Sequence, residues 1–135
     1  MKGNVQLHLC FDGAGREIEV LDVKRMSKDT VKIMENPIFS DVVSYGDIIR
    51  VREDKDIYYY QEMVRKSDLV RHSWLLSKEA TESQEIEEFK NQIIKMNGNW
   101  EQVFGGFLIV NIPADRKIGL DDSIRSIIEK LGNDM

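Results

Sequence analysis

Three polar residues, Ser67, Asp68 and His72, lie close enough in the sequence to suggest a hydrolytic site. Such a site needs a histidine base beside a serine nucleophile, a carboxylate that orients the histidine, and an oxyanion hole. If residues 69–76 form a strand, His72 shares its face with Trp74, as a packed histidine does. We therefore expect no catalytic residues and predict that the protein is not an enzyme, with a hydrolase using Ser67 or His72 as the alternative.

Metal and cofactor chemistry is weakly supported by the sequence. Cys10 is the only cysteine, so the chain cannot form an internal disulfide, which agrees with a reducing compartment. His8 and Cys10 share one face of an alternating segment, but a structural zinc site needs four ligands, usually in close pairs. Gly105-Gly106 links two apolar segments, whereas a phosphate-binding loop joins a strand to a helix. We expect neither a metal nor a cofactor.

Acidic residues gather in two parts of the sequence. One group surrounds Asp54 and Asp56 in a predicted hairpin loop, and the other opens a predicted helix around Glu85 and Glu88. Carboxylates in the first turn of a helix interact favourably with its dipole, so a solvated face is the simple explanation. If the two groups converge in space, they would instead attract a basic partner quickly and specifically.

A tyrosine run follows the first acidic group. On a strand, Tyr58 and Tyr60 face one way and Tyr59 faces the other. Exposed tyrosines are favoured at protein interfaces, whereas packing within the protein is the alternative. The expected partner-binding surface comprises Asp54, Asp56, Tyr58, Tyr60, Glu85 and Glu88.

The composition argues against nucleic acid and membrane as partners. The net charge is −5, whereas binding to a phosphate backbone relies on clustered lysine and arginine. No apolar run approaches the roughly 20 residues that span a bilayer. The first four residues lead straight into an alternating pattern instead of the apolar stretch of a signal peptide. We expect a cytoplasmic protein.

The first half of the chain, residues 1–66, predicts an all-β lobe. Apolar and polar residues alternate from the start, and the alternation changes phase near Val20-Leu21, which predicts a β-bulge or a bend there. Pro37 and Gly46 bracket an ordered corner, because each suits a restricted or unusual backbone angle. Five or six short strands joined by tight turns indicate a curled antiparallel sheet or partial barrel.

The second half, residues 67–135, predicts strand, helix, strand, strand, helix. Thr81 and Gln84 have the spacing of a capping box before an apolar stripe of helical period, and Asn97-Gly98 ends that helix. The order is that of a ferredoxin-like β-α-β-β-α unit without its last strand. The break between the lobes is short, so we expect both to pack together as one compact α+β domain.

The corner carries a distinctive motif. Asn36-Pro37-Ile38-Phe39, followed by Val43-Ser44-Tyr45-Gly46-Asp47, resembles the bacterial family catalogued as domain of unknown function 4265. The resemblance continues through the acidic hairpin, the first helix and the strand Phe107 to Pro113, so it spans nearly the whole chain. Asp68-Leu69-Val70 replaces a small polar run common in the family, which argues against a reactive side chain there. The resemblance implies the fold and no established activity.

These observations indicate a small acidic protein-binding module. The leading hypothesis is an immunity protein, similar in action to an antitoxin, that neutralises a toxin domain with a basic surface. Nuclease toxins are generally basic, so an acidic inhibitor can cover the site that would hold phosphate. The alternative is a regulatory domain that binds a small ligand between its lobes or across the seam of a homodimer.

Overall fold

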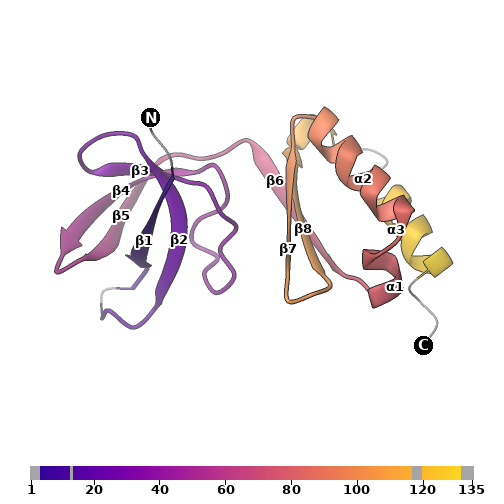
Figure 1. Ribbon diagram of the computed structural model, residues 1–135. Coiled ribbons are helices and arrows are strands. Elements are labelled where there is room, and N and C mark those ends of the chain that lie inside the picture. The colour runs from indigo at the N-terminus through magenta and orange to yellow at the C-terminus, as the bar shows by residue number, and fades with distance from the viewer. Residues whose placement is uncertain (1–3, 13, 117–119, 132–135) are drawn as a thin grey trace. The chain divides into compact units, whose positions relative to one another are not determined.

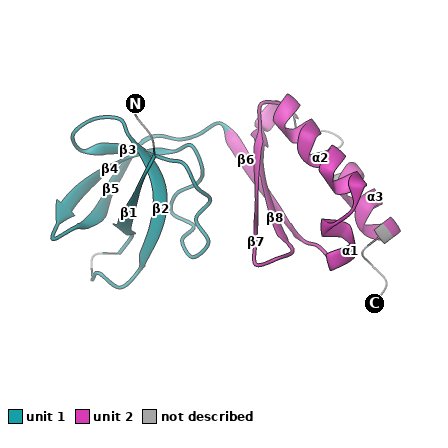
Figure 2. Ribbon diagram, viewed as in Figure 1, with its two compact units in different colours: residues 1–68 teal, residues 69–135 magenta. Residues whose placement is uncertain are grey.

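The computed structural model describes residues 4–12, 14–116 and 120–131. The chain forms two compact units, Met1–Asp68 and Leu69–Met135 (Figures 1 and 2). The architecture is mixed α+β, as the sequence predicts: five strands form one sheet, and three strands with three α-helices form the second unit. Within the described residues, no helix is long and apolar enough to cross a membrane.

Unit 1 is a closed five-stranded barrel in which each strand pairs with the next along the chain. These neighbouring pairs are antiparallel, which confirms the predicted curled antiparallel sheet, and a parallel pairing of the first strand with the fifth closes the barrel. The strands are β1 (Val5–Cys10), β2 (Ile18–Arg25), β3 (Thr30–Ile33), β4 (Ile48–Asp54) and β5 (Ile57–Arg65).

The β-bulge predicted near Val20-Leu21 is wrong. The β1–β2 register runs without a shift from Val5↔Val23 to Cys10↔Ile18. Ile18 and Val20 simply point outward, with exposed fractions of 38% and 42%, whereas Leu21 and Val23 point into the barrel. The register shifts lie instead between β4 and β5. Two apolar side chains on the solvent face produced the apparent change of phase.

The barrel interior is filled by alternating apolar side chains of β1 to β4 and by Val43 from the corner, and β5 adds only partly buried side chains. Leu9, Val23, Val31, Ile33 and Ile49 have no exposed surface. Phe11, Tyr58, Tyr60 and Met63 pack around this cluster at its edges.

Two buried carboxylates hold the corner between β3 and β4. Glu19 of β2 accepts hydrogen bonds from the backbone N–H groups of Ile38 and Phe39, with N···O distances of 2.6 and 3.2 Å. Asp47 accepts from the N–H groups of Ser44 at 2.7 Å and Ser67 at 2.8 Å.

The ammonium group of Lys66 completes the set of donors to Asp47. Its Nζ lies 3.1 Å from Asp47 Oδ2. The side chain of Asp47 is fully buried, whereas that of Lys66 is 60% exposed. Buried backbone groups need partners, so these carboxylates let an irregular segment lie against the barrel.

Unit 2 is a three-stranded antiparallel sheet in the order β6-β8-β7 with helices on one face (Figure 1). Its elements are β6 (Leu69–Leu75), α1 (Lys78–Thr81), α2 (Gln84–Lys95), β7 (Asn99–Val103), β8 (Phe107–Pro113), the 3-10 turn η1 (Ala114–Arg116) and α3 (Leu120–Leu131). Leu108, Val110 and Ile112 face the helices and pack with Ile86 and Ile124. Ile109 and Asn111 occupy the alternate positions and are buried as well, so β8 is buried on both faces.

The helix predicted to begin at a Thr81 capping box begins instead after Ser83. The Ser83 hydroxyl accepts a hydrogen bond from the N–H of Ile86, at 3.1 Å, as an N-cap does. The residues before it form the separate short helix α1, capped by Ser77, and the Thr81 hydroxyl donates back to the carbonyl of Lys78. Thr81 therefore has the spacing of a capping box but lies inside α1 instead of capping α2.

Replacement of Asp47 by alanine should destabilise the protein by about 3 kcal/mol, because it leaves buried N–H donors without an acceptor. The exposed Asp41 of the same corner is a matched control, and its replacement by alanine should change stability by less than about 0.5 kcal/mol. Urea unfolding of the two variants measures the difference. Equal stabilities would show that the Asp47 contacts do not hold the corner.

Candidate functional site

The turn between β4 and β5 presents acidic side chains on a constrained backbone. Lys55 and Asp56 form a two-residue hairpin turn with φ of 55° and 69°, the positive angles typical of a type I′ turn. Asparagine and glycine adopt these angles most readily, so this sequence retains a lysine and an aspartate at some cost. Asp54 and Asp56 are exposed, and neither forms an ion pair with a cation of the described residues. The turn therefore holds two uncompensated carboxylates toward solvent.

The tyrosine run divides between two faces, as predicted from strand alternation. Tyr58 and Tyr60 pack against the barrel core and are half-buried. The ring of Tyr59 has the guanidinium of Arg52 over it, 4.9 Å from the ring centroid. Arg25 lies 5.4 Å from the centroid of Tyr58 and donates to its hydroxyl at 2.9 Å. Tyr58 and Tyr60 thus support the strand below the acidic turn, and only part of each ring is accessible.

Glu85 of α2 is already paired. Lys130 Nζ of α3 lies 2.8 Å from Glu85 Oε2 and joins the two helices. The hydrogen bond from Lys130 lowers the pKa of Glu85, and the same contact raises the pKa of Lys130. The charge of Glu85 is therefore largely neutralised within unit 2.

Glu88 of α2, Glu79 of α1 and the α1 C-cap residue Glu82 are not compensated by any cation of the described residues. Glu88 makes only a long contact with Gln84 Nε2, at 3.5 Å, and Glu79 and Glu82 form no ion pair with the described cations. Glu87, in contrast, lies 3.6 Å from Lys90. We call Glu79, Glu82 and Glu88, all of them exposed, the helix acids. They belong to unit 2, whereas Asp54 and Asp56 belong to unit 1.

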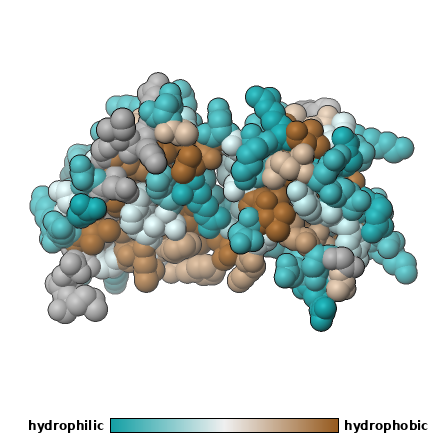
Figure 3. All heavy atoms as spheres, turned by 180° about the vertical axis from the view of Figure 1, so that it is seen from behind, coloured by the Kyte–Doolittle hydropathy of each residue, from teal (hydrophilic) through white to brown (hydrophobic). Residues whose placement is uncertain are grey.

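Exposed apolar side chains lie at the end of β6 and in the β7–β8 turn. Leu75 is 78% exposed and Phe104 is 75% exposed, and hydrophobic patches interrupt the hydrophilic surface in Figure 3. The N–H of Leu76 donates to the carbonyl of Gly106 at 2.7 Å, which holds the start of α1 against the β7–β8 turn. A hollow of about 340 Å³ opens there, lined by Leu76, Glu82 and Gly106 among others. The hollow thus has one acid, Glu82, and one lysine, Lys78, in its lining. We call this end of unit 2, formed by α1 with the end of β6 and the β7–β8 turn, the α1 surface.

The residues considered for hydrolysis occupy different units. Ser67 belongs to unit 1, where its N–H donates to Asp47, and His72 lies on β6 in unit 2. The His72 ring stacks on Trp74, with centroids 6.1 Å apart, on the face that packs against the helices. His72 Nε2 is buried and has no hydrogen-bond partner within the described chain. The structure thus places His72 as a packing residue.

Cys10 is a buried thiol next to an aspartate. Its Sγ donates to the carbonyl oxygen of Asp12 at 3.0 Å and to Asp12 Oδ1 at 3.1 Å. Burial raises the pKa of Cys10. The pKa of Asp12 is lowered, first by the hydrogen bond from the N–H of Glu17 and then by that from the Cys10 thiol. Cys10 is thus held as a neutral thiol. Among the residues placed by the structure, no three His, Cys, Asp or Glu side chains gather as metal ligands.

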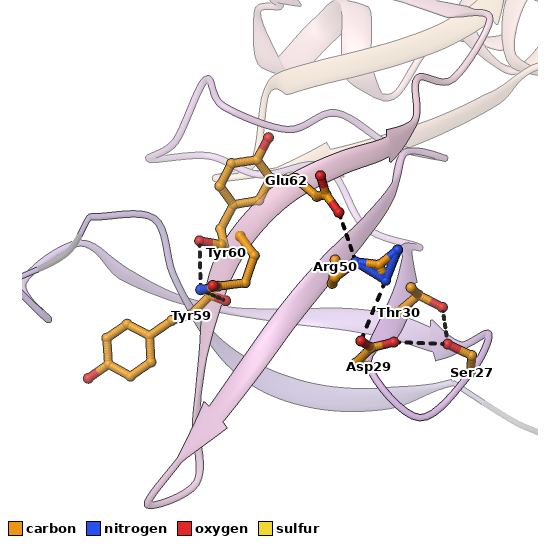
Figure 4. A network of polar contacts seen from close by, with 8 residues as sticks. Ser27, Asp29, Thr30, Arg50, Tyr59, Tyr60 and Glu62 are labelled. Atoms are coloured by element: carbon orange, nitrogen blue, oxygen red, sulfur yellow. Dashed lines mark hydrogen bonds and ion pairs between the residues drawn. The ribbon is translucent and has the colours of Figure 1, made fainter.

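A cationic groove on the barrel was not predicted from the sequence. It measures about 540 Å³ and is lined by residues of the β2–β3 turn, β4 and the start of β5. Its charged residues are Arg25, Lys28, Asp29, Arg50, Arg52 and Glu53. Figure 4 shows Arg50 between Asp29 and Glu62. Arg50 and Arg52 alternate on one strand, so the sequence could have indicated that they share a face. Lys28, in the β2–β3 turn, joins them in the groove only through the fold.

The Glu85–Lys130 pair should make stability depend on pH at acid values. Because the pKa of Glu85 is lower in the folded protein, its stabilisation is present above its unfolded pKa and is lost as pH falls through the folded pKa. Glu85→Gln should flatten the fall in the urea midpoint between about pH 6 and about pH 3. Glu88→Gln, which removes an acid without an ion-pair partner, is the control and should keep the wild-type slope. Identical slopes for wild type and Glu85→Gln would contradict this role.

Comparisons with known proteins agree on the fold. A solved structure described as "Novel crystal structure of a hypothetical protein from Neisseria gonorrhoeae" is similar, with a TM-score of 0.63 and 17% identity over 96% of this chain and 88% of that chain. At this identity the similarity concerns the fold alone. The comparison with curated proteins gave no match. The family model for Domain of unknown function (DUF4265) matches residues 19–134, and the chain therefore belongs to this family.

Proposed function

We propose that this protein is a binding module that acts as an immunity protein and neutralises a partner domain with a basic surface. The observation that carries the proposal is the set of exposed helix acids, Glu79, Glu82 and Glu88, which no cation of the described chain compensates. Unpaired carboxylates on a well-packed element attract and orient a basic partner without prior loss of internal ion pairs. The protein would then act by binding instead of catalysis.

The α1 surface adds apolar anchors to this charge. Leu75 and Phe104 are mostly exposed, and the hollow beside Glu82 offers a place for a partner side chain. Interfaces draw most of their binding energy from a few large anchors, while charged residues at the rim set association rate and partner choice. This combination supports an interface centred on α1 and the opening of α2.

Asp54 and Asp56 form a second candidate contact. Their turn has positive φ at two residues that are not glycine, and such strain commonly marks positions kept for function. The half-buried Tyr58 and Tyr60 would contribute their accessible edges beside it. Glu85, paired with Lys130, would support the helix surface and contribute little net charge.

Charge reversal of Glu82 and Glu88 to lysine should weaken binding to the cognate partner by about tenfold or more and reduce its salt dependence. The first partner to test is the protein encoded by the neighbouring gene. The two proteins are co-expressed, and calorimetry measures their affinity. Glu129→Lys, an exposed acid on α3, is the matched control and should keep wild-type affinity. A stable complex that tolerates reversal of Glu82 and Glu88 would remove the α1 surface as its interface.

A regulatory domain that binds a small ligand between its lobes or across a dimer seam is the second candidate. The antiparallel order β6-β8-β7 with helices on one face supports it, because a ferredoxin-like unit without its last strand would have this order. Both outer strands of that sheet are edges, and an edge strand can pair with a second copy.

Light scattering tests the dimer form of this candidate. The dimer predicts a mass near twice the 15.7 kDa of the chain. A monomer at all concentrations would exclude the dimer seam, and a thermal-shift screen against metabolites would then test the ligand alone.

A further inference from the structure

The cationic groove of unit 1 reverses the charge sign of a chain whose net charge is −5. Four of its lining residues are cations and two are carboxylates: Arg25, Lys28, Arg50, Arg52, Asp29 and Glu53. Its volume, about 540 Å³, lies within the range of pockets that hold small organic ligands. The groove is therefore a local concentration of positive charge of suitable size for a small anion.

Arg50 does not supply the available charge. Its Nε donates to Glu62 Oε2 at 2.8 Å, and its Nη1 lies 3.5 Å from Asp29 Oδ2 (Figure 4). The backbone carbonyl of Asp29 accepts from the N–H of Val51 at 2.8 Å, and its carboxylate contacts the hydroxyl of Ser27 at 3.4 Å. These contacts neutralise Asp29 and fix the β2–β3 turn against β4.

Arg25, Lys28 and Arg52 supply the available charge. No carboxylate pairs with them in the parts of the chain that the structure places. Arg25 is held by the ring and hydroxyl of Tyr58, and Arg52 by the ring of Tyr59. A guanidinium has five N–H donors, so these aromatic contacts fix its position while most donors remain free. Two oriented guanidinium groups therefore stand beside a lysine without a counter-ion.

We propose that this groove binds a small phosphate monoester that also carries hydroxyl groups. A planar guanidinium matches the oxygen atoms of a phosphate through paired hydrogen bonds, and Lys28 adds a point charge. Glu53 and Gln61 line the same groove and can accept hydrogen bonds from ligand hydroxyl groups. The negative charge of Glu53 also repels a polyanion without hydrogen-bond donors. The groove therefore favours an anion that carries hydroxyl donors.

A nucleic-acid backbone fits this site less well. Glu53 lines the groove and is followed in the chain by the exposed Asp54 and Asp56, carboxylates that would repel a continuing chain of phosphates. A single phosphate avoids that repulsion.

Titration of the full-length protein with ribose 5-phosphate, followed by amide NMR, tests the proposal. Saturable shifts are expected in residues 25–29 and 50–53, with inorganic phosphate binding about tenfold more weakly and ribose not at all. Absence of saturable shifts would overturn the proposal. Equal affinity for inorganic phosphate and ribose 5-phosphate would reduce the site to non-specific anion binding, and tighter binding of a single-stranded oligonucleotide would reassign it to nucleic acid.

Variants assign the binding to named side chains. Arg25→Gln combined with Arg52→Gln should weaken ribose 5-phosphate binding at least about tenfold, and Lys28→Gln should weaken it by a smaller factor. Lys28 lies on an exposed turn, so its variant tests the site even if the double variant fails to fold. Lys95→Gln, an exposed lysine on α2, should leave affinity unchanged. Wild-type affinity in both groove variants would contradict the assignment.

Discussion

Hydrogen bonds from backbone N–H groups to the buried carboxylates of Glu19 and Asp47 hold the irregular segment between β3 and β4. The corner has no strand partner for much of its length, and without these acceptors its donors would be buried unsatisfied. Asp47 reaches both the corner and the end of unit 1 through Ser44 and Ser67. The aspartate of the Ser-Tyr-Gly-Asp motif therefore stabilises the fold directly.

The sequence predicted elements where periodicity was unambiguous. The apolar stripe of α2 was predicted correctly because that helix buries one face. In β1 the alternation holds at Leu7 and Leu9, but Val5 is exposed and Cys10 on the opposite face is buried. The prediction of a bulge near Val20-Leu21 was wrong because the local pattern does not distinguish an exposed valine from a core valine. The prediction of a Thr81 cap was wrong because the pattern does not distinguish one hydroxyl residue from another nearby. Closure of the barrel and the grouping of Arg25 with Arg52 depend on pairing between strands distant in sequence.

The acidic residues that looked equivalent in sequence fall into distinct electrostatic states. Glu85 and Glu87 are paired with lysines of their own unit, whereas Glu82 and Glu88 form no ion pair with a cation of the described residues. The barrel, in turn, carries uncompensated arginines beside an acidic turn. Net charge thus describes this protein poorly, since charges of each sign gather on different local surfaces.

The parallel pairing of β1 with β5 affects how the chain folds during synthesis. During synthesis, β1 can pair with β2 early, but its other edge stays open until β5 has left the ribosome. The barrel cannot close with only its first four strands. Because β1 and β5 are distant in sequence, their pairing raises the loop-closure entropy cost of folding. A chain interrupted within β5 would expose an unpaired N-terminal edge and be prone to aggregation.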